Sequence, residues 1–473
     1  MLMTSARTVL IAAAACCLAV FAGATATVSA LGSSDHRLAD AVEARDQNGV
    51  RALLAQRADV DGVQPDGATA LHWAAHWDDR ESARRLIDAG ASVDAVNELG
   101  VSPLWVACTQ GSAPMVELLL SAGAGANVAL PSGETPLFTC ARTGTIAGVR
   151  ALLAHGADPN VVETTRGQTA LMWAVASSQA QVAKLLIDNG AGVSARSQGG
   201  FTPLLFAAQS GDVDSARLLL AAGADAKESA PDGSTPLLVS ALSIQAVTIS
   251  DYRLVPQPSG HEAVAELLLA HGADPNRADR LGVAPLHAAV ETGKRPLVQA
   301  LLAAPGVNPN VRIAKGLPFR RADYVSRAYY AGATPFWLAA KNGDVATMRI
   351  LLAGGADPNL PSENGTTPLL VAAGLGQTDS RMVSESRLLD AVQFLVERGA
   401  DVNAVNRNGQ NAIHGAAGVS ADLVLQYLAD RGAQINLKDK QGRTPLDVTQ
   451  VIMRPRLSTA ALLRKLGAEA RPQ

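Results

Sequence analysis

The chain has 473 residues, of which 48% are hydrophobic and 18% are charged, and its formal net charge is −3. A chain of this length ordinarily forms about three domains. A charge so close to neutral provides no global basic field that would attract nucleic acid, so nucleic acid is not an expected partner.

The first thirty residues differ from everything that follows. Arg7 is their lone basic residue, residues 9–23 form an apolar run, and small residues at 28–30 offer a cleavage site. This pattern is typical of a secretory signal peptide, and it predicts a mature protein that begins near Leu31 and is periplasmic or secreted. Two alternatives stay open. The run is long enough to remain as a membrane anchor, since about 20 residues span a bilayer, and Cys16 after a run of alanines weakly resembles a lipoprotein cleavage site.

Residues 31–64 form a unit that lacks the Thr-Pro start of the later units. Leu38, Val42 and Val50 give it one apolar face, while acidic and basic residues give it a polar one. Because a terminal unit of a stacked array must present a polar outer surface, we interpret residues 31–64 as an N-terminal cap.

The unit that organises the chain is cleanest at residues 199–225. Thr202 has the side chain of a helix N-cap, Pro203 suits the first helical position, and Gly211 ends this first short helix. A second helix follows with Leu219 on its apolar face. Helices below roughly 12 residues are marginal in isolation, so the unit requires neighbours.

Neighbours are present, because the residue after the N-cap recurs mostly every 33 or 34 positions. A fixed period of this length indicates a stacked solenoid. The recurring residues are Ala70, Pro103, Pro136, Ala170, Pro203, Pro236, Pro285, Pro335, Pro368, Ala412 and Pro445.

The unit resembles the ankyrin repeat. The resemblance rests on Thr-Pro-Leu-His-like starts at 135–138 and 284–287, and on Gly-Ala-Asp-Pro-Asn ends at 156–160, 272–276 and 355–359. It implies an all-α repeat solenoid, an ankyrin-like helix-turn-helix stack with β-hairpin fingers. The repeat array would cover residues 65–443 and a C-terminal capping repeat residues 444–473.

Three long intervals between repeats locate insertions. Those near 244–259 and 377–387 fall between the two helices of one repeat, whereas 311–331 lengthens a finger, the loop that ankyrin-like proteins point at partners. Loops of this length in compact folds are usually functional or disordered.

The long finger is rich in aromatic and basic residues, which are typical of binding hot spots. We therefore predict that it binds a protein partner, preferably an acidic surface, or an anionic ligand. A purely bracing role for its tyrosines is the alternative, and packing against the cap is the alternative for Trp77. The predicted partner-binding residues are Trp77, Phe201, Phe319, Arg320, Arg321, Tyr324, Arg327, Tyr329 and Tyr330.

The sequence contains one pair of histidines that could bind a metal ion. His72 and His76 have the spacing of two metal ligands on one helix, but His72 occupies a motif position shared with His287 and His414. In ankyrin-like folds this histidine ties the finger to the helix by hydrogen bonds, so we expect no metal. No hydrolase, phosphate-loop or dinucleotide motif is present, and we expect neither a cofactor nor an enzyme.

Cys108 and Cys140 lie in the first helices of adjacent repeats. An exported protein could oxidise them, but neighbouring helices lie about 8–10 Å apart and a disulfide requires Cα atoms closer than about 7 Å. This comparison predicts two free, buried thiols.

The sequence thus predicts an exported, non-enzymatic ankyrin-repeat scaffold of bacterial type that is a monomer and binds protein through its fingers and concave groove. Membrane contact is expected only if the N-terminal segment stays uncleaved. A secreted effector or toxin-associated protein acting on another cell is the alternative, followed by a hydrolase built on the long loops.

Overall fold

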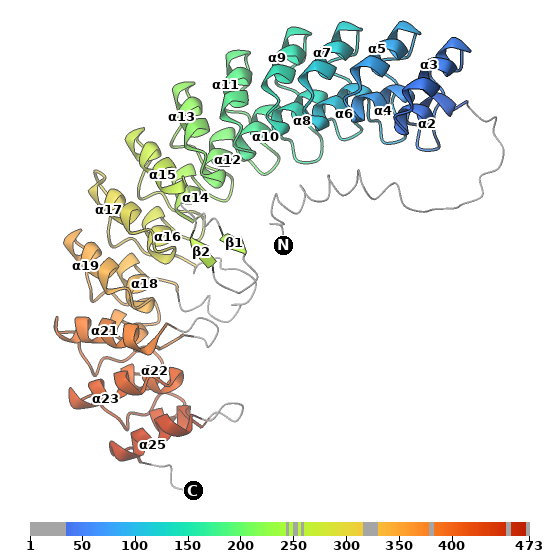
Figure 1. Cartoon of the computed structure of the whole chain (residues 1–473). Coiled ribbons are helices and arrows are strands. Elements are labelled where there is room, and N and C mark those ends of the chain that lie inside the picture. Colours follow the sequence, from blue (N-terminus) through green and yellow to red (C-terminus); the bar gives the residue numbers. More distant parts are fainter. Residues whose placement is uncertain are drawn as a thin grey trace.

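The computed structural model describes residues 35–242, 246–248, 254–256, 260–315, 330–377, 383–450 and 456–469. They form one curved stack of helix pairs (Figure 1). The N-terminal pair is α2 (Arg37–Glu43) and α3 (Gln47–Ala55). Each later repeat adds an inner helix on the concave side of the arc and an outer helix on the convex side.

The inner helices begin at the recurring positions. They are α4 (Ala70–His76), α6 (Pro103–Gln110), α8 (Pro136–Thr143), α10 (Ala170–Ala176), α12 (Pro203–Ser210), α14 (Pro236–Leu242), α16 (Pro285–Glu291), α18 (Pro335–Lys341), α20 (Pro368–Ala372), α22 (Ala412–Val419) and α24 (Pro445–Val448). The outer helices are α5 (Arg80–Asp88), α7 (Ala113–Ser121), α9 (Ile146–Ala154), α11 (Ala180–Asp188), α13 (Val213–Ala221), α15 (His261–Ala270), α17 (Arg295–Ala303), α19 (Val345–Ala353), α21 (Glu385–Val396), α23 (Asp422–Asp430) and α25 (Leu457–Lys465).

Local capping explains where the helices begin and end. The Thr202 hydroxyl accepts from the backbone N–H of Leu205 at 3.3 Å, which confirms the predicted N-cap. The outer helix of the same repeat is capped by Asp212, whose carboxylate accepts from Ser215 N–H at 3.1 Å. Gly211 ends α12 at a φ of 72°, in the left-handed region that favours glycine.

The core is a continuous layer of alanine and leucine between repeats. Leu219 and Leu268 on successive outer helices are fully buried, as are the inner-helix residues Ala174 and Ala207. Small alanine side chains let inner helices pack closely, and the apolar surface removed from water stabilises each interface between neighbours. The predicted all-α solenoid is therefore the observed fold.

The fingers are turns that join each outer helix to the next inner helix, and their backbones are linked. Glu98 N–H donates to Asp66 C=O at 3.0 Å, and Lys440 N–H donates to Asn408 C=O at 2.8 Å. The β-strands in the described part of the chain are β1 (Ala246–Thr248) and β2 (Leu254–Pro256), an antiparallel pair within the segment between α14 and α15.

Asparagine side chains link the bases of neighbouring fingers. Asn127 Nδ2 donates to Gly156 C=O at 2.8 Å, and its Oδ1 accepts from Asp158 N–H at 2.9 Å. Asn160 and Asn276 each make the same pair of contacts with the repeat that follows their own. Ser194 and Lys227 occupy this position in the two repeats between them.

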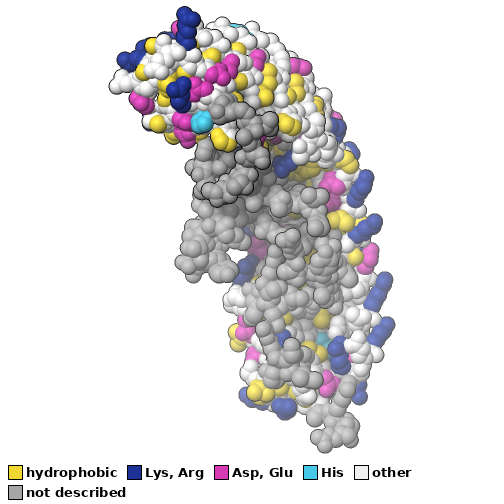
Figure 2. All heavy atoms as spheres, turned by 90° about the vertical axis from the view of Figure 1, so that its right-hand side faces the viewer, with side chains coloured by type: hydrophobic (Ala, Val, Ile, Leu, Met, Phe, Trp, Pro, Cys, Tyr) yellow, Lys and Arg dark blue, Asp and Glu magenta, His cyan; other side chains and the backbone are white. Residues whose placement is uncertain are grey.

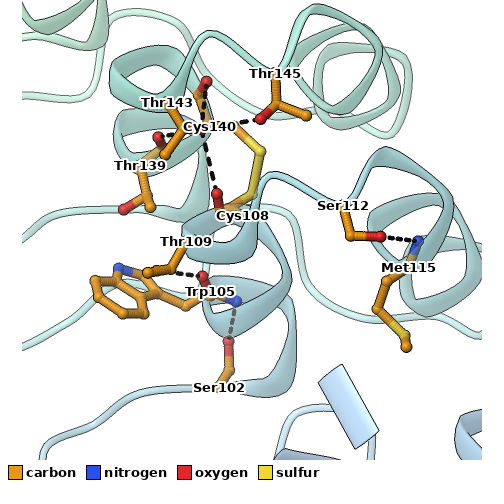
Figure 3. Close-up of a disulfide and its surroundings, with 10 residues drawn as sticks. All are labelled: Ser102, Trp105, Cys108, Thr109, Ser112, Met115, Thr139, Cys140, Thr143 and Thr145. Carbon is orange, nitrogen blue, oxygen red and sulfur yellow. Dashed lines mark hydrogen bonds between the residues drawn. A yellow bond between two sulfur atoms is a disulfide. The ribbon is translucent and has the colours of Figure 1, made fainter. Parts of the chain in front are cut away.

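The predicted free thiols are wrong, because Cys108 and Cys140 form a disulfide between α6 and α8 (Figure 3). Their Cα atoms are 4.7 Å apart. The prediction compared helix axes with Cα atoms. Each Cα lies about 2.3 Å from its helix axis, so facing Cα atoms of helices about 8–10 Å apart approach to about 4–5 Å.

The surface of the stack mixes charges of both signs. In the view of Figure 2, Lys and Arg side chains recur along one edge of the lower, C-terminal half, with acidic side chains among them. Among the described residues, no helix combines the length and the apolar character needed to cross a bilayer. The predicted signal segment, residues 1–30, lies outside the described residues.

Candidate partner-binding site

Trp77, at the end of α4, is the most open aromatic side chain of the N-terminal repeats. Its ring is 37% exposed and stacks on Trp73 at 6.3 Å between centroids. The guanidinium carbon of Arg45, from the turn after α2, lies 3.9 Å from the Trp77 centroid, and His76 meets the ring edge-on at 4.5 Å. The cap therefore holds the ring in place while more than a third of it stays accessible.

A second aromatic group crosses α8 and α10. Phe138 and Trp173 meet edge-to-face at 5.7 Å, and the Arg142 guanidinium carbon lies 5.9 Å from the Trp173 centroid. Phe138 is buried, whereas Trp173 and Arg142 are half-buried. Ring contacts of this kind fix the orientation of a large side chain without hiding all of it.

Three N–H donors in this region make no hydrogen bond to any described residue. They are the indole N–H groups of Trp105 and Trp173 and the Nε–H of Arg142. Trp105 occupies the motif histidine position, where Trp337 in a later repeat donates its indole N–H to Thr366 C=O at 2.9 Å. Buried polar groups in native proteins are nearly always paired, but these three donor atoms are themselves buried, so they belong to the packing between inner helices and not to the accessible surface.

Two carboxylates lie near these aromatic residues and differ in role. Glu163 is buried and accepts from the backbone N–H groups of Thr165, Arg166 and Gln168, so it is committed to its own finger. Partial burial, and secondarily the charge of Glu163, raises the pKa of Glu134. The protonated form of Glu134 is therefore favoured more than it would be for a fully exposed glutamate.

The predicted site residues that can be placed do not form one surface. Phe201 is half-buried and packs on Phe206 at 5.9 Å in the fifth finger. Tyr330, at the base of the long finger, meets Trp337 edge-on at 5.8 Å, and the Lys341 ammonium lies 5.1 Å from its ring. Tyr330 thus turns towards the body of the stack, as the bracing alternative expects. Phe319, Arg320, Arg321, Tyr324, Arg327 and Tyr329 lie outside the described residues.

A nearly buried ion pair lies beneath Tyr330. Lys341 Nζ is 3.3 Å from Glu291 Oε1, with the two side chains 13% and 4% exposed. Burial lowers the pKa of Lys341, but Glu291 and Tyr330 outweigh it, so the net effect is a raised pKa. The lysine is therefore held as a cation between α16 and α18 and serves the packing of this repeat.

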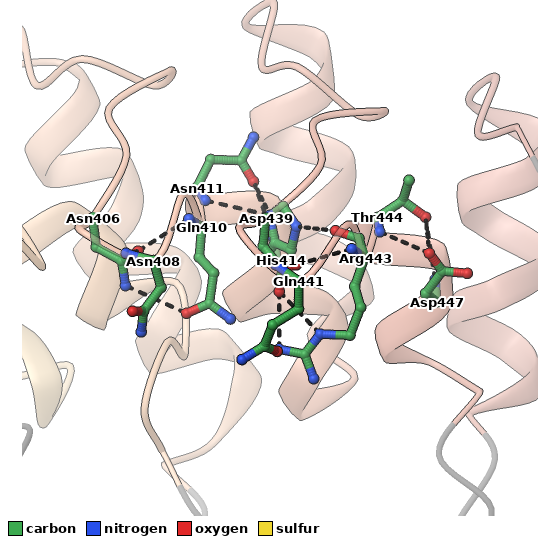
Figure 4. Close-up of polar contacts among 10 residues, drawn as sticks. All are labelled: Asn406, Asn408, Gln410, Asn411, His414, Asp439, Gln441, Arg443, Thr444 and Asp447. Carbon is green, nitrogen blue, oxygen red and sulfur yellow. Dashed lines mark hydrogen bonds and ion pairs between the residues drawn. The ribbon is translucent and has the colours of Figure 1, made fainter. Parts of the chain in front are cut away.

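The motif histidines have the structural role that the resemblance implied. Nδ1 of His72 accepts from Thr69 N–H at 3.1 Å, and its Nε2 donates to Val101 C=O in the next finger at 2.9 Å. His287 and His414 repeat this arrangement (Figure 4). Burial lowers the pKa of His287 to about 4. In the described part of the chain, no three His, Cys, Asp or Glu residues are grouped as a metal site would require.

Sequence reasoning missed the contacts among Phe138, Arg142 and Trp173 and the indole of Trp105 one repeat before them. A usable signal was present, because Trp105 and Phe138 replace the motif histidine and Trp173 follows that position directly. The motif histidine at this position normally donates a hydrogen bond to the next finger. A large aromatic residue in its place indicates a repeat with a different inner surface.

Models of ankyrin repeats match most of the chain. A three-repeat model matches residues 38–129 and 114–197, a single-repeat model matches 199–229, 331–363 and 364–407, and two further ankyrin models match 251–312 and 395–448.

Known proteins share parts of this array. Ankyrin repeat protein nuc-2 of Neurospora crassa is 32% identical over 120 residues, which are 25% of this chain and 10% of that protein. The mouse B-cell lymphoma 3 protein homolog is 31% identical over 157 residues, 33% of this chain and 30% of that protein. The chain thus spans less than a third of either relative. The solved human ASB11 ankyrin repeat domain is 27% identical, with a TM-score of 0.42, and covers 50% of this chain and 98% of its own. By its repeats, its motif histidines and its fold, the chain belongs to the ankyrin-repeat family.

Proposed function

We propose that the protein is an exported scaffold without catalytic activity, which binds a protein partner through aromatic side chains on its N-terminal inner helices. The observation that carries this proposal is Trp77, which is 37% exposed at the end of an inner helix and yet held in place by Trp73 and Arg45. Tryptophan and arginine are the residue types most enriched at binding hot spots, because each combines a large contact area with hydrogen-bond donors.

The surroundings of these side chains support binding rather than simple packing. Trp77 is 37% exposed yet fixed by Arg45 and Trp73, so little side-chain entropy would be lost when a partner covers it. The rigid stack places these rings on three of its first four inner helices after the cap, α4, α6 and α10. An extended concave surface of this kind is how solenoids contact their partners.

Export is the second part of the proposal. The N-terminal sequence pattern supports it, and so does the Cys108–Cys140 disulfide, because disulfides persist mainly in oxidising compartments. We propose that the protein is periplasmic or secreted. N-terminal sequencing of the mature protein should begin at or near Leu31, and a mature chain that still begins at Met1 would contradict cleavage.

The binding proposal is tested with the double variant Trp77→Ala, Trp173→Ala as bait in affinity capture from the native compartment. We expect proteins captured by the native chain to be lost, because both rings are removed from the inner surface. The matched control is Leu423→Ala, Leu457→Ala, which removes two exposed apolar side chains, 55% and 75% exposed, from outer helices. Equal capture by all three baits would place the interface elsewhere.

A further inference from the structure

The C-terminal fingers carry exposed cations for which the described residues provide no partner. Five basic side chains are exposed and make neither an ion pair nor a side-chain hydrogen bond among the described residues. We refer to them as the basic finger set, and they are Arg280, Lys315, Arg407, Lys438 and Lys440. Some surface cations elsewhere are paired, as in Arg85–Glu81 at 2.8 Å and Lys184–Asp188 at 2.5 Å.

The acidic residues of the same fingers do not compensate these charges. Asp279 Oδ1 accepts from Leu281 N–H at 2.9 Å and from Val283 N–H at 2.8 Å. Asp439, whose side chain is 2% exposed, accepts in the same way from Gln441 and Arg443. Both carboxylates are therefore turned into their own fingers. The described fingers of this half also expose acidic residues, which are outnumbered by their exposed arginines and lysines; they are Asp274, Asp357, Glu363, Glu397 and Asp401.

Backbone hydrogen bonds hold the last fingers in fixed register. Arg407 N–H donates to Asn364 C=O, and Lys440 N–H donates to Asn408 C=O, each at 2.8 Å. Arg443 is fixed on Asp439 through Nε at 3.0 Å and Nη2 at 2.9 Å while its side chain stays 45% exposed (Figure 4). Arg407 and Lys440 thus extend from a rigid support one repeat apart, whereas the finger before Arg407 exposes Glu363 instead of a cation of the set.

The N-terminal fingers differ in charge. Among their exposed residues, Asp94, Glu98 and Asp232 accompany Arg166 and Lys227, so both signs are mixed. The whole chain has a net charge of −3. The positive potential is consequently local to the C-terminal fingers, where it can select and orient a partner.

We propose that the basic finger set is a docking surface for an acidic segment of the partner protein. The proposal rests on the scaffold function proposed above and names the chemistry of a second contact. A polypeptide is favoured over single-stranded nucleic acid, since nucleic-acid surfaces combine cations with aromatic rings on which bases stack. The aromatic ring described at the base of these fingers, that of Tyr330, packs on Trp337 instead.

The test is a fluorescence anisotropy titration of the full mature protein with a labelled peptide of about 20 glutamates, chosen because uninterrupted carboxylates probe electrostatic docking alone. The variant is Arg407→Glu, Lys438→Glu, Lys440→Glu. The control is Arg84→Glu, Arg150→Glu, Arg217→Glu, which makes the same charge change at exposed positions on α5, α9 and α13. We expect the finger variant to weaken peptide binding at least ~10-fold and the control less than ~2-fold, with unchanged thermal melting for both, because surface substitutions change stability little.

Three outcomes would overturn the proposal. Equal weakening by both variants would mean that net charge alone attracts the peptide. If the native chain does not bind the peptide, the basic finger set is not a docking surface for acidic segments. Equal or tighter binding of a single-stranded oligonucleotide of the same charge would indicate a nucleic-acid surface. The Trp77→Ala, Trp173→Ala variant should bind the glutamate peptide normally, so a failure of the aromatic interface is separable from a failure of the basic fingers.

Discussion

The N-terminal and C-terminal halves of the stack use the same repeat in different ways. The first half keeps an interval of 33 or 34 residues, places partly exposed indoles on inner helices and joins α6 to α8 through a disulfide. The second half contains the inserted segments, a nearly buried Lys341–Glu291 pair and the basic finger set, whose exposed cations have no ion-pair partner among the described residues. One scaffold therefore carries an aromatic surface and a basic surface at separate places, because each repeat packs only on its neighbours.

The core should be equally important in the two halves. Leu219 on α13 and Leu351 on α19 are both fully buried, so Leu219→Ala and Leu351→Ala should each cost about 2–5 kcal/mol of stability. Hydrogen exchange should show lost protection mainly in the adjoining repeats. Equal loss at both ends of the array would show that the stack unfolds as one unit and that the halves are not independent.

The disulfide should stabilise the first half selectively. Its reduction should cost about 2–4 kcal/mol, seen as faster hydrogen exchange in α6 to α9 while α16 to α23 stay unchanged. The Cys108→Ala, Cys140→Ala variant should behave like the reduced native protein under either redox condition. If both cysteines of the unreduced protein react with an alkylating agent in denaturant, the bond is absent in solution.

Acid should weaken the repeat of His287 more than a repeat that lacks a motif histidine. Burial lowers the pKa of His287 to about 4 from 6.5, so the unfolded chain binds the proton more readily between these pH values. The stability that depends on neutral His287 is fully present above pH 6.5 and is lost as pH falls through 4, by up to about 3 kcal/mol. Hydrogen exchange at pH 7.5 and 4.5 checks this.

The internal control is the repeat in which Trp105 takes the histidine position, because an indole does not titrate. Amides of α6 should keep their protection across this pH range while those of α16 lose it. A uniform loss along the array would indicate that carboxylates, rather than the motif histidines, govern the acid response.

The sequence predicted what is decided within one repeat. Thr202, Pro203 and Gly211 set the limits of α12 by local hydrogen bonding and backbone preference, and the period of Leu and Ala predicted the stack. The motif role of His72, His287 and His414 followed from the ankyrin resemblance, because the same slot bonds the same neighbouring finger in each case.

Contacts between repeats were harder to predict. The Cys108–Cys140 bond and the Phe138–Trp173 contact depend on how two inner helices face each other, a rotation that no single-repeat pattern specifies. The positive charge of the C-terminal fingers could not be predicted from the composition, for a different reason. Asp279 and Asp439 lower the net charge of these fingers when it is counted from the sequence, yet both carboxylates turn inward to backbone N–H groups.

The asparagine contacts between finger bases have a consequence for how the arc responds to force. Asn127, Asn160 and Asn276 each join their repeat to the next by two short hydrogen bonds. At Ser194 and Lys227 the joints rely instead on long arginine side chains, Arg196 to Ser229 C=O at 3.1 Å and Arg277 to Ser229 Oγ at 3.0 Å. The connections between neighbouring repeats therefore differ along the stack. We expect tension applied at its two ends to separate the repeats first near α12 to α15.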